Sequence, residues 1–139
     1  MNAWLYQMVI RNEWSPEDYR VEVWEGQNVT WPSGKVTGAE ANEVIRGDVI
    51  FLFFAETRNP SPGIYGVGII TDYFPRRREI SFRVCPPSDH LKTDPLWDDD
   101  IKQAIARIRG KVLQGTMWRI PPAALKLIQL GVRRRMGSS

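Results

Sequence analysis

A continuous apolar run, Val49 to Ala55, sets the strongest limit on how this chain can fold. A strand in which every residue is apolar has to be buried on both faces, as in a small barrel or at the centre of a covered sheet. The run has the length of a strand and falls well short of the roughly 18 residues of a membrane span. It therefore predicts the central strand of a globular domain.

Other strand patterns flank this run. They cover residues 3–10, 20–24, 64–74, 80–84 and 112–120, where apolar and β-branched residues recur between turn-forming segments. Gly66 and Gly68 fall on one face of the strand over residues 64–74, where glycine marks a sharp bend or the close approach of a ligand or backbone. Residues 14–18 are expected to form a turn, and residues 27–36 an irregular segment.

Three helices are expected. Thr37 to Glu40 match the capping-box pattern, so a short helix should follow and end at Gly47. Asp98 to Asp100 suit the start of a second helix, because acidic residues there complement the helix dipole. Four residues that follow them share one helical face: Ile101, Ala104, Ile105 and Ile108. The pair Pro121-Pro122 fits the first turn of a last helix, which Gly131 should end.

The order of these elements, β, α, several β, α, β and α, indicates an α+β domain with a curved, mainly antiparallel sheet. A chain of 139 residues fits one domain and can bury a core without disulfides or a structural metal. No repeat or change of composition divides the chain. We therefore expect a single domain over residues 1–132 and a basic, flexible tail over residues 133–139.

Two features of the sequence bear on where the protein resides. The start of the chain lacks the basic-then-apolar pattern of a signal peptide, since Asn2 and Trp4 stand where positive charge is usual. The single cysteine, Cys85, excludes an internal disulfide and any multi-cysteine zinc site. These features predict a soluble cytoplasmic protein without a membrane partner, associated with the nucleoid if it is bacterial or archaeal.

The charge of the chain is unevenly distributed. Residues 1–47 hold four basic and seven acidic residues, whereas residues 48–139 hold 15 basic and nine acidic ones. No acidic residue follows Asp100, while nine lysines and arginines do. A region of one sign creates a positive field that attracts phosphates, so the charge favours a nucleic-acid partner over a merely solvated surface.

Catalytic patterns are weak in this sequence. Ser88-Asp89-His90 has the residue types of a hydrolase triad, but adjacent side chains cannot easily converge in the relay geometry. Asp100-Ile101-Lys102 resembles part of a nuclease metal site, yet it falls in a helical pattern where the acidic residues already serve as caps. Cys85 is expected to be a buried, inert thiol. We expect no enzymatic activity, no metal and no cofactor.

Aromatic residues favour binding. The chain contains six tryptophans, and a tryptophan is either buried or available as a platform for a flat ligand. Stacking on an aromatic ring is worth about 1–3 kcal/mol per nucleic-acid base. Trp31 lies in the segment expected to be irregular and is our candidate platform, whereas Trp4 and Trp24 are expected in the core. Trp14, Trp97 and Trp118 remain unassigned.

Several segments resemble the EVE branch of the PUA-like domains. Trp4-Leu5-Tyr6-Gln7 is similar to the opening strand, and Trp31 followed by Gly47-Asp48 and an apolar strand is similar to the central motif. Gly63 to Ile70 resembles the glycine-containing strand, and Asp94-Pro95-Leu96-Trp97 a later proline–tryptophan segment. The resemblance covers Ala3 to Leu130. The Gly-Asp motif also recurs in the related ASCH and YTH branches.

The resemblance implies a small, mainly antiparallel β-barrel with flanking helices. EVE and YTH domains hold a modified base, such as methylated cytosine or adenine, in an aromatic pocket and carry out no chemistry on it. Bacterial and archaeal EVE domains often accompany restriction systems, in which they supply recognition to a separate nuclease. The implied partners are therefore DNA that carries a modified base and a separate nuclease effector.

By position, the resemblance also implies site residues. Trp31 would be the first wall of the pocket, with Trp97 as a second aromatic and Tyr65 behind it. The rim would be formed by Ser33, Gly34 and Lys35. Phosphates would be held by Arg76, Arg77, Arg78, Arg133, Arg134 and Arg135. Residues 31–38 lack the Asn- and Arg-rich stretch of familiar EVE members, which leaves the preferred base open.

We therefore expect a non-catalytic domain that recognises methylated cytosine or adenine in DNA. One alternative is an ASCH-like RNA-binding module that has no preference for a modification. A small metal-dependent nuclease that uses Asp98 to Asp100 is another. A third is a protein-interaction domain whose tryptophans form a flat apolar patch.

Overall fold

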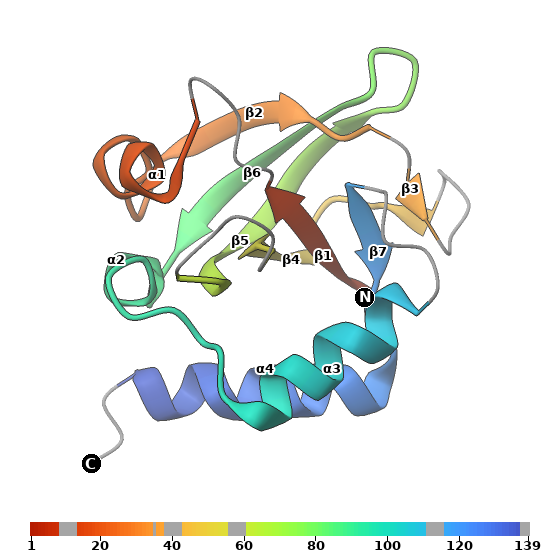
Figure 1. Ribbon diagram of the computed structural model, residues 1–139. Coiled ribbons are helices and arrows are strands. Elements are labelled where there is room, and N and C mark those ends of the chain that lie inside the picture. Colours follow the sequence, from red (N-terminus) through yellow and green to blue (C-terminus); the bar gives the residue numbers. More distant parts are fainter. Residues whose placement is uncertain (9–13, 35, 38–42, 56–60, 111–115, 137–139) are drawn as a thin grey trace.

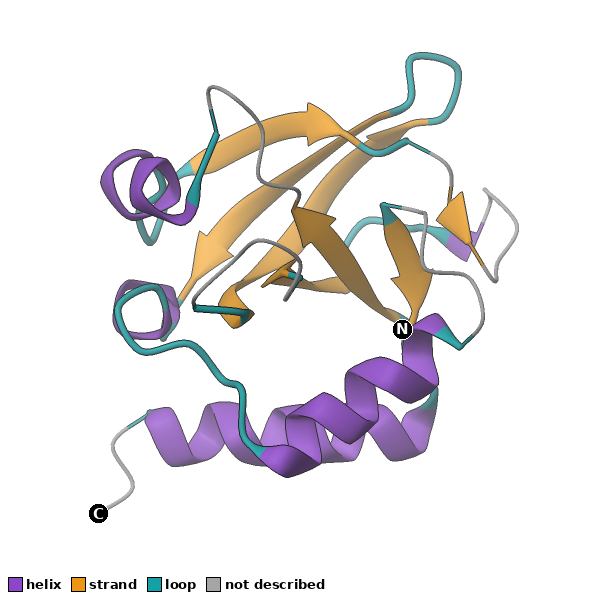
Figure 2. Cartoon of the chain, in the orientation of Figure 1, coloured by secondary structure: helices purple, strands orange, loops and turns teal. Residues whose placement is uncertain are grey.

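The computed structural model describes residues 1–8, 14–34, 36–37, 43–55, 61–110 and 116–136. The strands are β1 (Ala3–Met8), β2 (Asn28–Pro32), β3 (Val36–Thr37), β4 (Val49–Phe54), β5 (Gly63–Phe74), β6 (Glu79–Cys85) and β7 (Met117–Arg119). The helices are α1 (Pro16–Glu22), α2 (Ser88–Leu91), α3 (Asp99–Arg109) and α4 (Pro122–Arg135). Figure 1 shows α3 and α4 side by side across one side of the sheet, and Figure 2 shows how strands and helices are separated into layers.

All the described strands belong to one sheet, in the order β2-β6-β5-β4-β1-β7-β3. The β1–β4 and β3–β7 pairs are parallel, and the other neighbouring pairs are antiparallel. The predicted α+β fold with a mainly antiparallel sheet is confirmed. The β-barrel is not, because β2 and β3 are the two edges of the sheet and no ladder joins them among the described residues.

The sheet is open at the outer edge of β2, where Pro32 lacks a backbone donor. Pro32, at the end of β2, has no N–H to donate to a ladder. Its carbonyl oxygen accepts a hydrogen bond from the Tyr6 hydroxyl of β1 at 2.6 Å. Side chains therefore connect β2 to β1 where a closed barrel would have a backbone ladder.

The central strands are buried on both faces, as the apolar run over residues 49–55 predicts. Leu5, Phe51 and Phe53 face α3 and α4, while the alternate residues Tyr6 and Leu52 face the other side of the sheet, where α1 packs. The strands predicted over residues 64–74 and 80–84 correspond to β5 and β6. The core is thus divided by the sheet into two apolar clusters.

The aspartate of the Gly-Asp motif, Asp48, joins two strands through its buried carboxylate. The residue is 1% exposed, and its carboxylate accepts hydrogen bonds from the Asn2 N–H and the Trp4 indole, both at 3.0 Å. A third bond comes from the Ile45 N–H at 3.1 Å. Asp48 immediately precedes β4, and these bonds join the start of β4 to the start of β1. Gly47 turns the chain at this point with a φ of 96°.

The two longer helices begin where the sequence predicts. The Asp98 carboxylate caps α3 by accepting a hydrogen bond from the Ile101 N–H at 3.2 Å. Helix α4 begins at Pro122 but continues through Gly131 to Arg135, so the expected end at Gly131 is wrong. Gly131 lies inside the helix where α3 packs closely, since a Cβ atom there would lie 3.3 Å from the Ile101 side chain. The three arginines assigned to a flexible tail therefore lie in the last turn of α4.

Helix α1 corrects the predictions for residues 14–18 and 20–24. The expected turn forms a capping box, in which Ser15 and Asp18 bond to each other's backbone N–H groups and Pro16 occupies the first turn. The expected strand is the remainder of the helix, and Val23 is its C-cap. A helix of seven residues is too short to display a helical period, so the alternation over residues 20–24 was misleading.

Three other predictions agree with the structure only in part. The segment over residues 27–36 contains β2 and the start of β3, so it is not irregular throughout. Thr37 lies in β3 instead of capping a helix, and most of that predicted helix, residues 38–42, lies outside the described residues. The strand predicted over residues 112–120 is observed as β7, with residues 112–115 also outside the described part. No described helix has the length and apolar character needed to cross a bilayer.

Substitution Asp48→Ala should lower the free energy of unfolding by about 2–4 kcal/mol, because the buried Trp4 indole and two partly buried backbone N–H groups lose their acceptor. Asp72→Ala is the matched control, since that carboxylate is 54% exposed and lies 4.0 Å from Arg46. We expect a change below about 0.5 kcal/mol for the control. Urea unfolding followed by tryptophan fluorescence measures both, and equal effects would refute the structural role of Asp48.

Candidate functional site

A pocket of about 450 Å³ lies at the free edge of β2. Its size is in the range of small-molecule sites in proteins. In the part of the chain that the structure describes, its lining residues come from β1, β2 and the segments next to α1, β3 and β7. They are Tyr6, Gln7, Met8, Trp14, Trp31, Pro32, Gly34 and Thr116. Since three of these residues are aromatic, a flat ligand could contact rings from three separate segments.

Trp31 is a wall of this pocket, but it lies in a regular strand. It is half-buried, and its ring centroid lies 5.3 Å from that of Phe82 and 5.7 Å from that of Tyr6. The strand alternates exposed and buried positions, with Val29 and Trp31 on the inner side. Trp31 therefore serves both as a pocket wall and as part of the core, and its position is fixed by packing.

Trp14 is the second tryptophan of the pocket, and sequence analysis left it unassigned. It directly precedes the N-cap Ser15 of α1, and its ring packs edge-on against Tyr19 with a centroid distance of 6.3 Å. An apolar residue before the N-cap that packs against the fourth helical residue is a hydrophobic staple, which fixes how the chain enters a helix. The staple places Trp14 at 5.6 Å from Trp31. Recognition of the capping box would have identified it.

Tyr19 packs against both tryptophans of the pocket, Trp14 and Trp31, from the core of the domain. The residue is fully buried, and its ring also contacts Trp31 at 6.5 Å. Among the described residues its hydroxyl has no hydrogen-bond partner, and it occupies space left by Gly66, where a Cβ atom would lie 2.3 Å away. Burial, and secondarily the carboxylate of Asp89, raises the pKa of the Tyr19 phenol above its ordinary value. Close approach of another group is thus one reason for a glycine at position 66.

Of the expected rim residues that the structure describes, Gly34 lines the pocket and Ser33 does not. Gly34 lines the pocket with a φ of 57°, and a Cβ atom there would lie 2.4 Å from the Thr116 hydroxyl. Ser33 is fully buried, and its N–H donates to the Arg78 carbonyl at 2.7 Å, so it holds the backbone instead of facing a ligand. Lys35 lies outside the described residues.

The other two expected aromatics do not line the pocket. Trp97 packs against Phe53 on the side of the sheet that α3 and α4 cover, with a centroid distance of 5.7 Å. Tyr65 is fully buried on the pocket side, where its ring contacts Tyr19 and Phe54. Position in sequence could not assign these residues, because the two faces of one sheet alternate residue by residue.

The two arginine runs lie at different ends of the molecule. Arg76, Arg77 and Arg78 form the exposed turn between β5 and β6, next to Ser33 and therefore near the pocket. Figure 1 shows this turn at the top of the view and the end of α4, which carries Arg133 to Arg135, at the lower left. The structure thus separates two groups that the sequence analysis assigned to one site.

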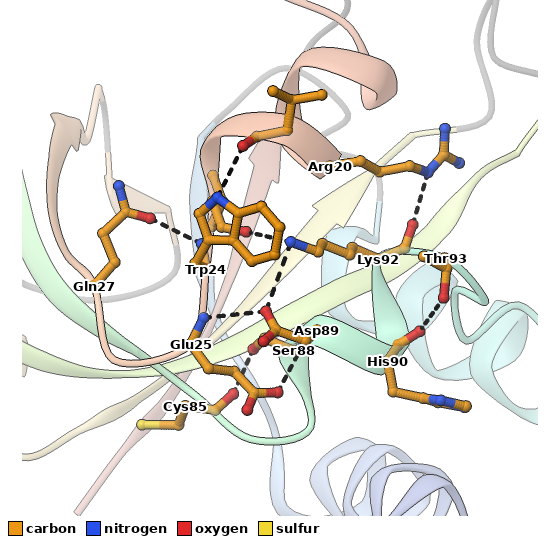
Figure 3. A network of polar contacts seen from close by, with 12 residues as sticks. Arg20, Trp24, Glu25, Gln27, Cys85, Ser88, Asp89, His90, Lys92 and Thr93 are labelled. Atoms are coloured by element: carbon orange, nitrogen blue, oxygen red, sulfur yellow. Dashed lines mark hydrogen bonds and ion pairs between the residues drawn. The ribbon is translucent and has the colours of Figure 1, made fainter.

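Ser88, Asp89 and His90 do not form a catalytic relay. The Ser88 hydroxyl accepts from the Val67 N–H at 3.0 Å and bonds to nearby carbonyls. Figure 3 shows the Asp89 carboxylate directed at Lys92, while the exposed His90 ring points away from both of its neighbours. These groups join α2 to the rest of the fold.

Lys92 is the centre of that network. Its ammonium is 3.5 Å from the ring centroid of Trp24 and donates to the Val23 carbonyl at 2.8 Å (Figure 3). The Asp89 carboxylate lies 3.6 Å away, so the nearly buried charge is compensated. Trp24 is 53% exposed, which corrects its expected place in the core.

Asp98 to Asp100, the acidic residues of the alternative nuclease site, lie at the start of α3, where Asp98 is the N-cap and Asp100 is in the first turn. Within the described ranges, no three His, Cys, Asp or Glu residues are grouped closely enough to hold a metal ion. Cys85 is a half-buried free thiol whose Sγ lies 3.4 Å from the Arg83 carbonyl.

Comparison with known proteins shows similarity in structure only. No protein-family model and no curated protein sequence matches the chain. A protein from Pseudomonas putida is 15% identical with a TM-score of 0.58, and the match covers 93% of this chain and 98% of that one. A hypothetical protein from Leishmania major is 9% identical with a TM-score of 0.55, covering 99% and 98%.

Human THYN1, solved in complex with DNA that contains 5-methylcytosine, matches over 100% of both chains with 9% identity and a TM-score of 0.52. The fold is PUA-like. At these identities the similarity extends to the architecture alone, which agrees with the fold class expected from the sequence.

Substitution Gly34→Ala should destabilise the protein more than Gly26→Ala. Both glycines have positive φ, which costs an L-residue about 1–2 kcal/mol, but only Gly34 has a neighbour, Thr116, in the space a Cβ would occupy. The collision should add roughly 1 kcal/mol or more. Thermal unfolding of the two variants tests this, and equal destabilisation would contradict the close approach.

Substitution Tyr19→Phe should raise the free energy of unfolding slightly at neutral pH, by up to about 1 kcal/mol, since the buried hydroxyl lacks a partner among the described residues. Because the folded-state pKa is raised, the folded chain keeps this proton while the unfolded chain releases it above about pH 10. Stability supplied by the neutral phenol is therefore lost as the pH rises past 10.

Urea unfolding near neutral pH and near pH 11 measures this effect, and the Phe variant should lose less stability than the parent protein. Tyr73→Phe, at a half-buried position of β5, is the control and should follow the parent. If Tyr19→Phe loses as much as the parent, the phenol is not held neutral by burial.

Proposed function

We propose that the protein is a non-catalytic DNA-binding domain of the EVE type that holds a modified base, methylated cytosine or methylated adenine, in the aromatic pocket. Tyr6, Trp14 and Trp31 would surround the base. A separate nuclease effector would act on the DNA that the domain recognises. RNA without a modification preference is the runner-up ligand class.

The group of Tyr6, Trp14 and Trp31 around one pocket is the observation that carries the proposal. The three side chains come from β1, the entry to α1 and β2, and each is held by its own packing contacts. Stacking on such rings is worth about 1–3 kcal/mol per base and requires no particular base. Identity would be read by polar groups of the lining, among which is the Thr116 hydroxyl.

Gln7 also lines the pocket, but its side chain points away from the aromatic walls, because Gln7 alternates with Tyr6 along β1 and pairs with Phe53, which faces α3 and α4. Its side-chain carbonyl oxygen accepts a hydrogen bond from the Arg109 guanidinium at 3.2 Å. A primary amide whose oxygen is occupied in this way presents its N–H groups as donors. Those donors lie on the α3 side of β1, so the Thr116 hydroxyl, beside Gly34 in the lining, is the better candidate to bond to the edge of a base.

The turn of Arg76 to Arg78 would bind the phosphates that flank the base. The hydrogen bond from the Ser33 N–H to the Arg78 carbonyl holds this turn beside the segment that lines the pocket. In duplex DNA the base must leave the stack, at a cost of a few kcal/mol that contacts with the rings and phosphates would offset. The complex of human THYN1 with 5-methylcytosine DNA supports this class of ligand for the fold.

Fluorescence anisotropy with matched oligonucleotides tests the proposal. Plain strands and strands with methylated cytosine or methylated adenine would be compared, in single-stranded and duplex form, at two salt concentrations. We expect tighter binding of one modified form. Trp14→Ala should weaken that binding about 5- to 150-fold, which corresponds to the loss of about 1–3 kcal/mol of stacking.

Two further variants make this result specific. Trp31→Leu removes the second indole but keeps an apolar side chain against Phe82, so the fold should persist while the preference is lost. Trp97→Ala removes an aromatic from the opposite side of the sheet and should leave the preference unchanged.

The other outcomes refute the proposal in distinct ways. Equal, salt-sensitive binding of plain and modified strands would make the domain a general nucleic-acid or RNA-binding module. Metal-dependent cleavage that is abolished by Asp100→Ala would identify a nuclease. Failure to bind any oligonucleotide would leave a protein-interaction domain as the better reading of the aromatic residues.

A further inference from the structure

The layer of α3 and α4 presents a surface with mostly one sign of charge. Beyond the first turn of α3 the two helices contain no acidic residue. Their exposed basic side chains are Lys102, Arg107, Lys126, Arg133 and Arg134. Lys102 lies 3.9 Å from Asp99, and Arg135 is paired with Asp94.

Helix α4 places its charges on one side. Lys126, Arg133 and Arg134 are separated by seven and eight residues, which corresponds to about two turns of an α-helix. The opposite side of α4 is anchored by Ala124, Ile128 and Gly131, which are buried against the domain. The basic side chains therefore face solvent together, over roughly 12 Å of helix.

This basic surface cannot serve the aromatic pocket. Helices α3 and α4 cover the side of the sheet formed by residues such as Leu5 and Phe53, whereas the pocket opens on the side of Tyr6 and Trp31. Figure 1 shows the end of α4 and the β5–β6 turn at opposite ends of the view. A phosphate that flanks a base in the pocket can be reached from Arg76 to Arg78 but not from α4.

We propose that α4, together with the exposed side of α3, is a second phosphate-binding surface, which holds a DNA duplex segment other than the one whose base enters the pocket. The domain would then contact DNA on two sides and could hold two duplex segments together. The inference rests on the proposed nucleic-acid partner but not on the pocket or on base modification.

Charge and burial favour a duplex over a membrane as the occupant. A helix that lies in a bilayer surface needs a broad apolar face to insert. The apolar side of α4 is already buried in the domain, and its exposed apolar residues are limited to Leu130 and Met136. A row of positive charge without apolar area matches the regularly spaced phosphates of DNA.

Two triple variants with equal loss of charge test the proposal. The helix variant is Lys126→Gln/Arg133→Gln/Arg134→Gln, in which glutamine preserves helix propensity. The turn variant is Arg76→Gln/Arg77→Gln/Arg78→Gln. Both alter exposed side chains, and circular dichroism and thermal unfolding would verify that each keeps the fold.

Binding to an unmodified 30-base-pair duplex would be measured over a range of salt concentrations. Each phosphate contact contributes about −0.9 to the slope of log Kobs against log salt concentration. The slope of the helix variant should therefore be less negative than that of the parent by about 2–3. Energy transfer between a donor-labelled and an acceptor-labelled duplex would report bridging. The parent should bring the two duplexes together, and the helix variant should not.

The results also separate this proposal from the pocket hypothesis. The helix variant changes no residue of the pocket lining, so it should keep any preference for a modified base while it loses slope and bridging. Unchanged slope and unchanged bridging in the helix variant would overturn the second surface, as would bridging that depends on the turn variant alone. Retention on phosphatidylserine vesicles that the helix variant abolishes, with duplex binding unaffected, would assign the surface to a membrane and overturn it as well.

Discussion

The buried carboxylate of Asp48 determines how the first strand joins the centre of the sheet. By accepting bonds from Asn2, Trp4 and Ile45, it fixes the start of β1 against the start of β4, and the pairs Ala3–Val49 and Tyr6–Leu52 follow. A slip of one residue would turn every side chain of β1 to the other face. The position of Tyr6 in the pocket therefore depends on a carboxylate at the far end of its strand.

The pocket exists because the sheet does not close. The outer edge of β2 has no strand partner among the described residues, and the Tyr6 hydroxyl bonds to Pro32 there. The staple between Trp14 and Tyr19 then places a second indole over this edge. Each ring is held by contacts that also stabilise the fold, so the aromatic walls are in place before a ligand binds, which limits the entropy lost on binding.

The accuracy of the sequence-based predictions varied with the kind of pattern. The apolar strand over residues 49–54, the strands β5 and β6 and the cap of α3 are local patterns, and the structure confirms them. Helix α1 was mistaken for a turn and a strand because its seven residues show no period, although its capping box was present in the sequence. The pocket lining includes Trp31 and Gly34, which are among the expected site residues, and also Trp14 and Tyr6, which the sequence analysis did not assign to a site.

Chain order and residue type were enough to define the α+β class with a mainly antiparallel sheet, the strand that is buried on both faces and the basic C-terminal third. They could not define which aromatic residues meet, because neighbouring residues of a strand point to opposite faces and the partner comes from a distant segment. Trp97 and Trp31 thus lie on different sides of the sheet, and the arginines of α4 lie away from those of the β5–β6 turn. Those separations follow from strand register and helix packing, which are properties of the assembled sheet and not of any one segment.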